Sequence, residues 1–326
     1  MTTEPLGFIG LGNMGGAIGQ RIQGAGYSLV VYDIRPEAAA PLVQAGARLA
    51  SCPAEVAREC AIVLSSLPGP VQVEQVALGP GGLIEGIRQG SIYVDLSSSS
   101  ASLIRRVAEL FQAKGASVLD GPLSGGREEL LAGKQEVMIG GDIAVLEQVR
   151  PILCTFGDQI FHAGDIGAGT VCKLAHNMAM RGLLQIVAES MTLGVKAGVE
   201  AETVWEAIRR GLFGKMSTLH RTLPATALRG SYDQASYTLA LAYKDQLLAT
   251  ALGREVNIPL PVANLVEQFL VQAMNRGWGH KASSVPFVLQ EEAAGVEVRA
   301  PNIDLEEAER YISIHPEARF QGGRPA

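Results

Sequence analysis

The sequence predicts an α/β fold with a doubly wound, mostly parallel sheet at the N-terminus, a long interdomain helix and an all-α C-terminal domain. Three observations carry this prediction. Apolar strand-like runs alternate with helical runs as far as about residue 165, a pattern typical of βαβ units. After that point the strand-like runs stop and only helical periodicity continues. With 326 residues, the chain also exceeds the size at which one hydrophobic core usually stops growing.

The composition argues against several classes of protein and partner. The chain is 47% hydrophobic and 18% charged, and its net charge of −6 disfavours binding to nucleic acid or to an anionic membrane. No apolar run reaches the ~18 residues of a membrane span, and MTTEP leads directly into a strand without a signal-peptide pattern. The four cysteines include no CxxC pair, and the histidines share no metal-site spacing. We therefore expect a cytoplasmic protein without a metal site.

The first strand is followed by a glycine turn that indicates a dinucleotide site. Residues 6–9 are apolar and residues 17–24 are helical in pattern. The GxGxxG pattern between them consists of Gly10, Leu11, Gly12, Asn13, Met14 and Gly15. In this context Gly10 permits a tight turn, Gly12 lets the backbone approach a pyrophosphate, and Gly15 allows close packing of the helix. Because a helix N-terminus also suits phosphates, the sheet is predicted to be of the Rossmann type.

The second strand-like run, residues 28–32, ends at Asp33, about 20 residues beyond the glycine turn. An acidic side chain at this position would bind the ribose hydroxyls of a dinucleotide and repel the 2′-phosphate of NADP. Arg35, two residues further on, is able to accept such a phosphate instead. The expected cofactor is therefore NAD, with NADP as the alternative.

Strands and helices keep alternating through the rest of the first domain. Further strands are expected at 61–65, 91–96, 117–119 and 136–140, and helices at 36–45, 53–59, 71–77, 101–114 and 142–153. Polar or glycine-rich segments follow three of the strands, at 66–70, 97–100 and 120–126. Because the carboxyl ends of parallel strands share one edge of a sheet, these segments are expected to converge on one ligand crevice. Asp120 is expected to tie down the turn before Pro122.

A long helix over residues 168–198 is expected to connect the two domains. Its apolar side chains recur at steps of three and four without an interior proline, and Gly198 suits its end. Lys173 and Asn177 lie four residues apart, on one face, among apolar neighbours. A charge buried there would be unfavourable unless it had an ion partner or a catalytic role. On the helix alone, a lysine that snorkels to water is the simpler interpretation. His176 points away from Lys173 on the helical wheel and is interpreted as a packing residue.

The expected domain boundaries follow from these patterns. The dinucleotide-binding domain covers residues 1–165, the helical domain residues 166–295, and a polar C-terminal extension residues 296–326. Helical runs in the second domain are expected at 201–211, 236–253, 260–275 and 283–293. The long helix and a surplus of apolar residues suggest self-association, so a homodimer or a homotetramer is expected.

Six segments together resemble the β-hydroxyacid dehydrogenase family, which includes 3-hydroxyisobutyrate dehydrogenase and tartronate semialdehyde reductase. They are GFIGLGNMG at 7–15, SSLPGP at 65–70, DLSSSS at 95–100, DGPLSGG at 120–126, GAGTVCKLAHN at 167–177 and AYKDQ at 242–246. The likeness covers roughly residues 6–290 in consistent order, which is much more specific than one glycine turn. It implies an NAD(P)-dependent oxidoreductase that acts on a small β-hydroxy acid or its semialdehyde.

The resemblance also implies roles for single residues. Lys173 corresponds to the general acid/base of hydride transfer, and Asn177 to a residue that orients the substrate. The segment Ser124, Gly125 and Gly126 corresponds to the binding site for the substrate carboxylate. Implied cofactor contacts are Leu67, Pro68 and Ser98, with Lys244 near the nicotinamide end and Asp245 lining the same pocket. By composition alone, Ser98 could equally cap the following helix, and Lys244 and Asp245 could be an exposed pair.

Three departures from the family pattern put its usual small substrates in doubt. Family members often carry phenylalanine where this chain has Tyr237, which adds a hydroxyl to the substrate pocket. A charged segment at 127–129 follows the Ser-Gly-Gly segment. Ala282 stands where the family usually has an aspartate. The substrate is therefore expected to be larger or more polar. Alternatives on the same plan are an imine reductase, whose relatives lack the lysine, a 6-phosphogluconate-type oxidative decarboxylase, and a non-catalytic cofactor-binding protein.

Overall fold

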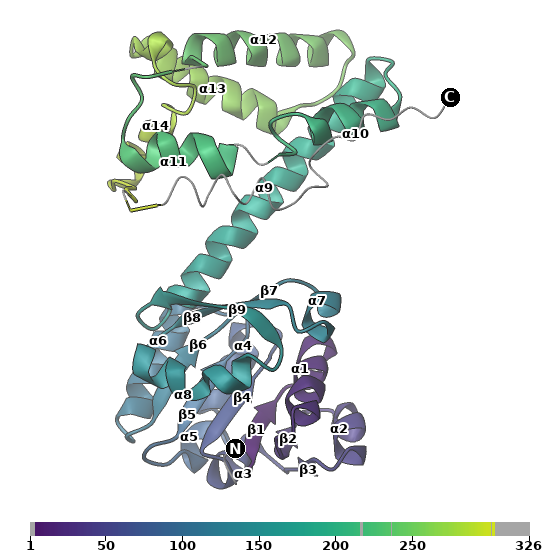
Figure 1. Cartoon of the computed structure of the whole chain (residues 1–326), viewed down its shortest axis with the longest axis vertical. Coiled ribbons are helices and arrows are strands. Elements are labelled where there is room, and N and C mark those ends of the chain that lie inside the picture. The colour runs from purple at the N-terminus through teal and green to yellow at the C-terminus, as the bar shows by residue number, and fades with distance from the viewer. Residues whose placement is uncertain (1–3, 216–217, 236, 301, 304–326) are drawn as a thin grey trace. The chain divides into compact units, whose positions relative to one another are not determined.

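The computed structural model describes residues 4–215, 218–235, 237–300 and 302–303 (Figure 1). The chain forms two compact units, Met1–Ala179 and Met180–Ala326, and the division falls inside the long helix α9 (Ala168–Lys196). None of the helices in the described ranges combines the length and the apolar character that a bilayer span requires.

The first unit is built on one nine-stranded sheet. Its strands are β1 (Leu6–Ile9), β2 (Leu29–Tyr32), β3 (Arg48–Leu49), β4 (Ile62–Ser65), β5 (Ile92–Asp95), β6 (Ser117–Asp120), β7 (Leu123–Ser124), β8 (Gln135–Gly140) and β9 (Gly157–Gly164). They lie in the order β3-β2-β1-β4-β5-β6-β8-β7, with β9 paired to β8. Pairing is parallel from β3 to β6 and between β8 and β9, and antiparallel where β8 meets β6 and β7. The expected doubly wound, mostly parallel sheet is therefore confirmed, and its strand order reverses between β1 and β4.

Helices cover both faces of this sheet (Figure 1). They are α1 (Asn13–Gly24), α2 (Ala40–Gln44), α3 (Pro53–Glu59), α4 (Pro70–Leu78), α5 (Leu83–Gly86), α6 (Ala101–Gln112), α7 (Arg127–Leu131) and α8 (Ile143–Leu153). Phe8 belongs to the core cluster that includes α1 and α8, whereas its neighbour Ile9 belongs to the cluster that includes α3 and α6. Successive side chains of a strand point to opposite faces, so a strand buried on both sides must be apolar throughout. That is why these strands appear in the sequence as short continuous apolar runs.

Three strands were not expected from the sequence. β3 and β7 have only two residues each, too few for a recognisable pattern. β9, with the sequence GDQIFHAG, pairs only with β8 and alternates irregularly between buried and exposed positions. Edge strands of this kind are formed by pairing with a neighbour and not by local preference, so composition does not reveal them.

The start of α9 is fixed to the sheet by a buried carboxylate. Asp120, at the end of β6, is 1% exposed and accepts the backbone N–H groups of Gly167 at 2.7 Å and Thr170 at 2.6 Å. A Cβ atom on Gly169 would lie 2.1 Å from the carbonyl oxygen of Met138 in β8, so only glycine permits this close approach. Asp120 therefore anchors the first turn of α9 as a helix cap, a larger role than the expected tie to the turn before Pro122.

The second unit is helical over the residues that the structure describes, with one isolated bridge between Thr238 and Ala282. Its helices are α10 (Ala201–Arg210), α11 (Leu223–Ala225), α12 (Leu239–Glu255), α13 (Pro261–Asn275) and α14 (Phe287–Ala294). Leu239, Leu270 and Val285 belong to its buried core. Of the expected polar extension at 296–326, residue 301 and residues 304–326 lie outside the described part of the chain.

Candidate active site

The glycine turn lies between β1 and α1 and is shaped by close contacts. Gly10 has a φ of +86°, and a Cβ atom there would lie 2.4 Å from the carbonyl oxygen of Ser66. A Cβ atom on Gly15 would lie 1.9 Å from the Gly10 carbonyl oxygen, so α1 packs directly on the turn. Gly12 is different, because a Cβ atom there would meet no other atom within 4 Å. The structure thus leaves open space at the glycine that the sequence assigned to the approach of a pyrophosphate.

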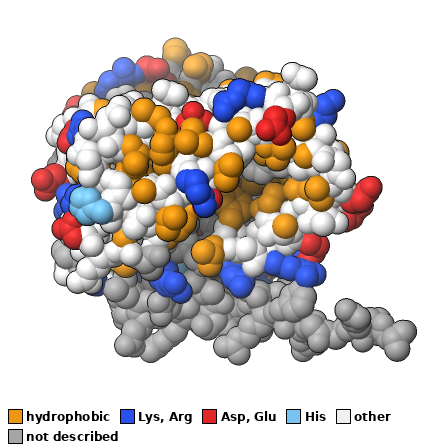
Figure 2. Space-filling model, turned by 90° about the horizontal axis from the view of Figure 1, so that it is seen from above, with side chains coloured by type: hydrophobic (Ala, Val, Ile, Leu, Met, Phe, Trp, Pro, Cys, Tyr) orange, Lys and Arg blue, Asp and Glu red, His pale blue; other side chains and the backbone are white. Residues whose placement is uncertain are grey.

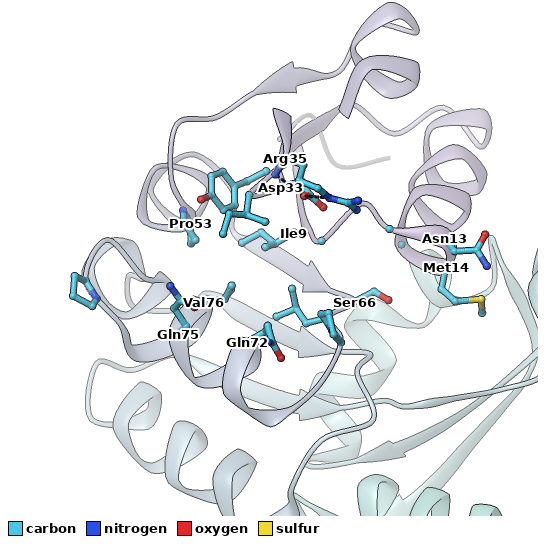
Figure 3. Close-up of a pocket in the computed structure, with 18 residues that line it drawn as sticks. Ile9, Asn13, Met14, Asp33, Arg35, Pro53, Ser66, Gln72, Gln75 and Val76 are labelled. Carbon is cyan, nitrogen blue, oxygen red and sulfur yellow. Dashed lines mark hydrogen bonds and ion pairs between the residues drawn. The ribbon is translucent and has the colours of Figure 1, made fainter. Parts of the chain in front are cut away.

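A cavity of about 520 Å³ opens beside this turn (Figure 3). The residues assigned to the cofactor that line it are Gly10, Gly12, Asn13, Met14, Gly15, Asp33, Arg35, Leu67 and Pro68. Gly12 is also the N-cap of α1 and offers no side-chain cap, so N–H groups of the first turn remain available for a phosphate. The open glycine, the uncapped helix and the cavity together fit a dinucleotide.

Asp33 stands at the end of β2, 8% exposed, with both oxygens held by backbone donors (Figure 3). Oδ2 accepts the N–H of Leu11 at 2.7 Å, and Oδ1 accepts the N–H of Arg35 at 2.8 Å. Leu11 itself is a core residue, so its part in the turn is this backbone bond. The Arg35 guanidinium is 63% exposed and approaches the Asp33 carboxylate at 3.8 Å. Both the carboxylate that favours NAD and the cation that suits NADP therefore lie at this cavity.

A buried hydrogen-bond chain that the sequence did not indicate supports the opposite wall of the cavity. Ser97 Oγ accepts the N–H of Leu67 at 2.9 Å and donates to Asp95 Oδ1 at 2.6 Å. Ser65 also donates to this oxygen, at 2.9 Å. Burial raises the pKa of the Asp95 carboxyl to about 6. Ser98, the serine that the resemblance assigned to the cofactor, is exposed and does not line the cavity, whereas its neighbour Ser97 holds the Leu67 segment.

Lys173 lies in the second turn of α9 and is only 8% exposed. Burial lowers the pKa of its ammonium, and the nearby charge of Glu136 opposes part of that effect. Its side chain therefore does not snorkel to water. Asn177 follows one turn later on the same helix and is half-buried. A lowered pKa makes it easier for a lysine to release and take up a proton during a reaction.

The Ser-Gly-Gly segment faces the same stretch of α9. Ser124 Oγ lies 3.4 Å from Nε2 of His176, which is exposed and not the packing residue expected from the helical wheel. Gly125 has a φ of +126°, a conformation that favours glycine. The Gly126 N–H donates to Oε2 of Glu129 at 2.9 Å, so one of the backbone donors expected for a substrate carboxylate is engaged inside the protein.

Three further residues assigned to the site lie together in the second unit. The Tyr237 hydroxyl donates to Oδ2 of Asp245 at 2.5 Å, and Lys244 Nζ approaches Oδ1 of Asp245 at 3.0 Å. The hydrogen bond to Asp245 raises the pKa of Tyr237 to about 12 and lowers that of Asp245. All three side chains are at least 44% exposed. They form one polar cluster at α12, available to a ligand of that unit.

The chain matches two family models over most of its length. The NAD binding domain of 6-phosphogluconate dehydrogenase matches residues 5–164, and the NAD-binding domain of NADP-dependent 3-hydroxyisobutyrate dehydrogenase matches residues 167–286. A 2-(hydroxymethyl)glutarate dehydrogenase from Eubacterium barkeri is 32% identical over 90% of this chain and 97% of its own length. The chain belongs to the β-hydroxyacid dehydrogenase family. It is an NAD(P)-dependent dehydrogenase of that family.

Further relatives and solved structures are similar to this chain. An NAD-dependent L-serine dehydrogenase from Pseudomonas aeruginosa is 36% identical over 65% of this chain and 71% of its own. The solved 3-hydroxyisobutyrate dehydrogenase of Mycobacterium tuberculosis with L-serine is 25% identical, with a TM-score of 0.62 over 88% of this chain and 99% of its own. An imine reductase from Myxococcus stipitatus has a TM-score of 0.80 over 89% of this chain and 100% of its own, at 21% identity. That last likeness concerns the fold alone.

The described residues contain no group of three or more histidine, cysteine, aspartate or glutamate side chains that could hold a metal ion. The polar groups at the candidate site of this dehydrogenase are instead backbone donors, one lysine and hydroxyl or carboxylate side chains. Such a set suits proton transfer and the binding of a carboxylate.

Proposed function

We propose that this dehydrogenase transfers a hydride between NAD(P) and a short β-hydroxy acid or its semialdehyde, with Lys173 as the general acid/base. The observation that carries the proposal is the state of Lys173: an amine 8% exposed, with a lowered pKa and no ion pair within 4 Å among the described residues. Its helix turn is anchored to the end of β6 through Asp120, so its place on the sheet is well defined. A cation without an ion partner in such surroundings suggests a task in proton transfer.

The chemistry needs two transfers: a hydride at the hydroxyl-bearing carbon and a proton at the oxygen bonded to it. The bound nicotinamide supplies the hydride acceptor in oxidation and the hydride donor in reduction. In oxidation, neutral Lys173 takes the proton of the substrate hydroxyl as the C–H bond at the same carbon breaks. In reduction, the ammonium form donates the proton and stabilises the negative charge that develops on oxygen. Burial helps both directions, because it brings the pKa of Lys173 down toward the working pH.

The remaining residues are proposed to bind and orient the ligands. Asn177 orients the reacting group beside Lys173, and Ser124, Gly125 and Gly126 receive the substrate carboxylate. From the resemblance alone, Tyr237 and Asp245 are proposed as substrate contacts and Lys244 as a contact of the nicotinamide end of the cofactor. Ser98 is proposed as a further cofactor contact, although Ser97 is the serine whose hydrogen bond supports the cavity wall.

A screen of short 3-hydroxy acids with NAD and NADP, followed by the absorbance of the reduced nicotinamide, tests the activity. The sharper test is Lys173→Ala, which should lower kcat by about 10²- to 10⁴-fold and leave cofactor binding nearly unchanged. Lys196→Ala, at the exposed end of the same helix, is the matched control and should keep full activity. Equal activity of the two variants would contradict the assignment of Lys173.

Imine reduction and oxidative decarboxylation remain alternatives on the same fold. The buried lysine favours the hydroxy acid reaction over imine reduction, because the resemblance associates a lysine at this position with hydroxy acid chemistry. It also argues against a protein that binds the cofactor without catalysis, since a desolvated lysine without a task is costly. Turnover of cyclic imines but not of hydroxy acids would overturn this choice.

We also propose that the protein is cytoplasmic and works as a homodimer or homotetramer. The second unit exposes many large apolar side chains, and Figure 2 shows apolar side chains gathered on the face seen from above. Those more than 40% exposed include Trp205, Leu212, Phe213, Leu219, Leu241, Leu248 and Leu265. Surfaces of this kind are commonly covered by another subunit. Sedimentation of the whole chain as a monomer would contradict this proposal.

A further inference from the structure

Glu136 in β8 is a half-buried carboxylate for which the proposed reaction has no use. Its side chain makes no hydrogen bond and no ion pair with any residue that the structure describes. It nevertheless lies close enough to Lys173 to act on that amine by its charge. A partly desolvated carboxylate without a donor is unfavourable, so its surroundings favour a ligand that brings one.

The strand register places Glu136 beside the carboxylate-binding segment. β7 pairs antiparallel with β8, and Ser124 lies directly opposite Glu136. Directly opposed residues in an antiparallel pair project on the same face of the sheet. That face is the one toward α9, because Ser124 Oγ reaches His176 at 3.4 Å. The neighbouring Gln135 is fully buried, as expected for the other face.

Glu136 is therefore paired with one of the two points at which the substrate is held and acts by its charge on the other. The proposed function places the substrate carboxylate at Ser124 to Gly126 and the C3 hydroxyl at Lys173, so this inference rests on that function. In a 3-hydroxy acid the carbon between the carboxylate and the hydroxyl-bearing carbon is C2. The substituent on C2 is then the part of the substrate that faces Glu136.

We propose that Glu136 is a specificity-determining residue that binds an ammonium group on C2, so that the site takes 2-amino-3-hydroxy acids. An ammonium donates charge-assisted hydrogen bonds to the free carboxylate and satisfies it. A methyl group or a hydrogen on C2 leaves the carboxylate unpaired, and a second carboxylate on C2 is repelled. The redox step is unchanged: the C3–H bond breaks, the hydride passes to the cofactor, the hydroxyl proton passes to Lys173, and the C2 ammonium keeps its proton.

The test compares three substrates that differ only at C2. They are serine in both enantiomers, 3-hydroxypropionate and hydroxymethylmalonate, assayed at about pH 7, where an α-amino group is charged. The readout is the ratio of their kcat/KM values, because any effect of Glu136 on Lys173 acts on all three substrates and cancels. The wild-type protein should prefer one serine enantiomer to 3-hydroxypropionate by about tenfold or more, and to hydroxymethylmalonate by a larger factor.

Glu136→Gln removes the charge and keeps the shape of the side chain. It should lower the preference for serine over 3-hydroxypropionate by about tenfold and raise the relative use of hydroxymethylmalonate. Glu128→Gln is the matched control, since Glu128 is an exposed carboxylate near the same segment, and it should leave all ratios unchanged.

Three results would overturn the inference. The first is a wild-type protein that oxidises 3-hydroxypropionate as well as serine, which decides the question even if the variant does not fold. The second is a Glu136→Gln variant with unchanged ratios, because Glu136 would then act on Lys173 or on the fold alone. The third is a wild-type protein that oxidises none of the three acids. If it still oxidises another short 3-hydroxy acid of the screen, only this inference is refuted, and if it oxidises none of the screened acids, the proposed function is refuted as well.

Discussion

The Asp120 carboxylate at the end of β6 accepts the backbone N–H of Thr170, in the first turn of α9, at 2.6 Å. Its other oxygen accepts the N–H of Gly167 at 2.7 Å, and the whole side chain is 1% exposed. Lys173 follows Thr170 by less than one helical turn. The same contact therefore sets where the proposed catalytic amine stands relative to the sheet.

Asp120→Asn should lower both the stability of the protein and its activity. An amide replaces one accepting oxygen by an NH₂ group, which would face a backbone N–H and leave it unpaired. We expect a loss of about 1–3 kcal/mol in the free energy of unfolding and a fall in kcat, because the start of α9 loosens. Chemical denaturation and steady-state kinetics measure the two effects.

The control for Asp120 is another aspartate that caps a helix. Asp142 accepts the N–H of Ala144 at 2.7 Å at the exposed start of α8. Asp142→Asn should lose less stability and keep full activity, since water can replace the exposed bond. If both variants lost activity to the same extent, the link between Asp120 and Lys173 would be refuted.

Asp95 should make stability depend on pH in an unusual direction. Burial raises the pKa of its carboxyl from 3.8 to about 6, so between these values the folded protein binds a proton that the unfolded chain does not. This contribution to stability is fully present below about pH 4 and is lost as the pH rises through 6. Asp95→Asn keeps the accepting oxygen, carries no charge, and should be more stable than the wild-type protein at pH 7, by up to about 3 kcal/mol.

Denaturation of Asp95→Asn and of the wild-type protein across this pH range isolates the effect. Other carboxylates titrate in both proteins, so their contributions cancel in the difference between the two free energies of unfolding. The difference in the free energy of unfolding should grow from pH 4 to pH 6 and then stay constant at up to about 3 kcal/mol. A difference that does not change with pH would show that Asp95 titrates normally in the folded protein.

These contacts mark where prediction from the sequence ends. The glycine turn and the alternation of strands and helices were recognisable because each depends on residues close together in the chain. The Asp120 cap joins residues 47 and 50 positions apart, and only the folded sheet brings them together. Four serines follow β5, and the sequence does not show which of them bonds to Leu67. The path of the backbone after the strand brings Ser97, and not Ser98, to the N–H of Leu67.

The helical wheel of α9 shows a related limit. It leads to the interpretation of His176 as a packing residue, whereas the side chain is exposed, because a wheel does not say what faces each side chain. β7, with only two residues, brings Ser124 to His176, and a strand that short has no detectable pattern. The helical pattern of α12 likewise does not reveal the bond between Tyr237 and Asp245. Tyr237 precedes the helix, and the path of the chain before the helix brings it to Asp245.

The choice between NAD and NADP should depend on Asp33 and Arg35. Asp33→Asn keeps an oxygen that can accept the N–H of Leu11 but removes the charge that repels a 2′-phosphate. We expect the kcat/KM ratio of NADP to NAD to rise by about tenfold or more. Arg35→Ala should change the same ratio in the opposite direction, because the guanidinium that could bind the phosphate is lost.

Asp158→Ala is the control for this experiment, since Asp158 is an exposed aspartate of the first unit on β9, outside the cavity lining. It should leave the NADP to NAD ratio as in the wild-type protein. An unchanged ratio in Asp33→Asn as well would mean that the carboxylate does not contact the ribose.

Glu129 should compete with the substrate for a backbone donor. Its Oε2 accepts the N–H of Gly126 at 2.9 Å, in the segment proposed to bind the substrate carboxylate. Glu129→Ala frees this donor and removes a like charge beside the incoming carboxylate. We expect KM for the hydroxy acid to fall by about threefold to tenfold, with little change in kcat, because the substrate and the transition state share this contact.

The matched variant is Glu128→Ala, since Glu128 has the same charge in the same short helix but no bond to Gly126. If both variants lowered KM equally, general repulsion by this helix would explain the effect and the competition for one N–H would not. A higher KM in Glu129→Ala would lead to a different conclusion. Glu129 caps the first turn of α7, and the segment would then need that cap to keep the conformation that receives a carboxylate.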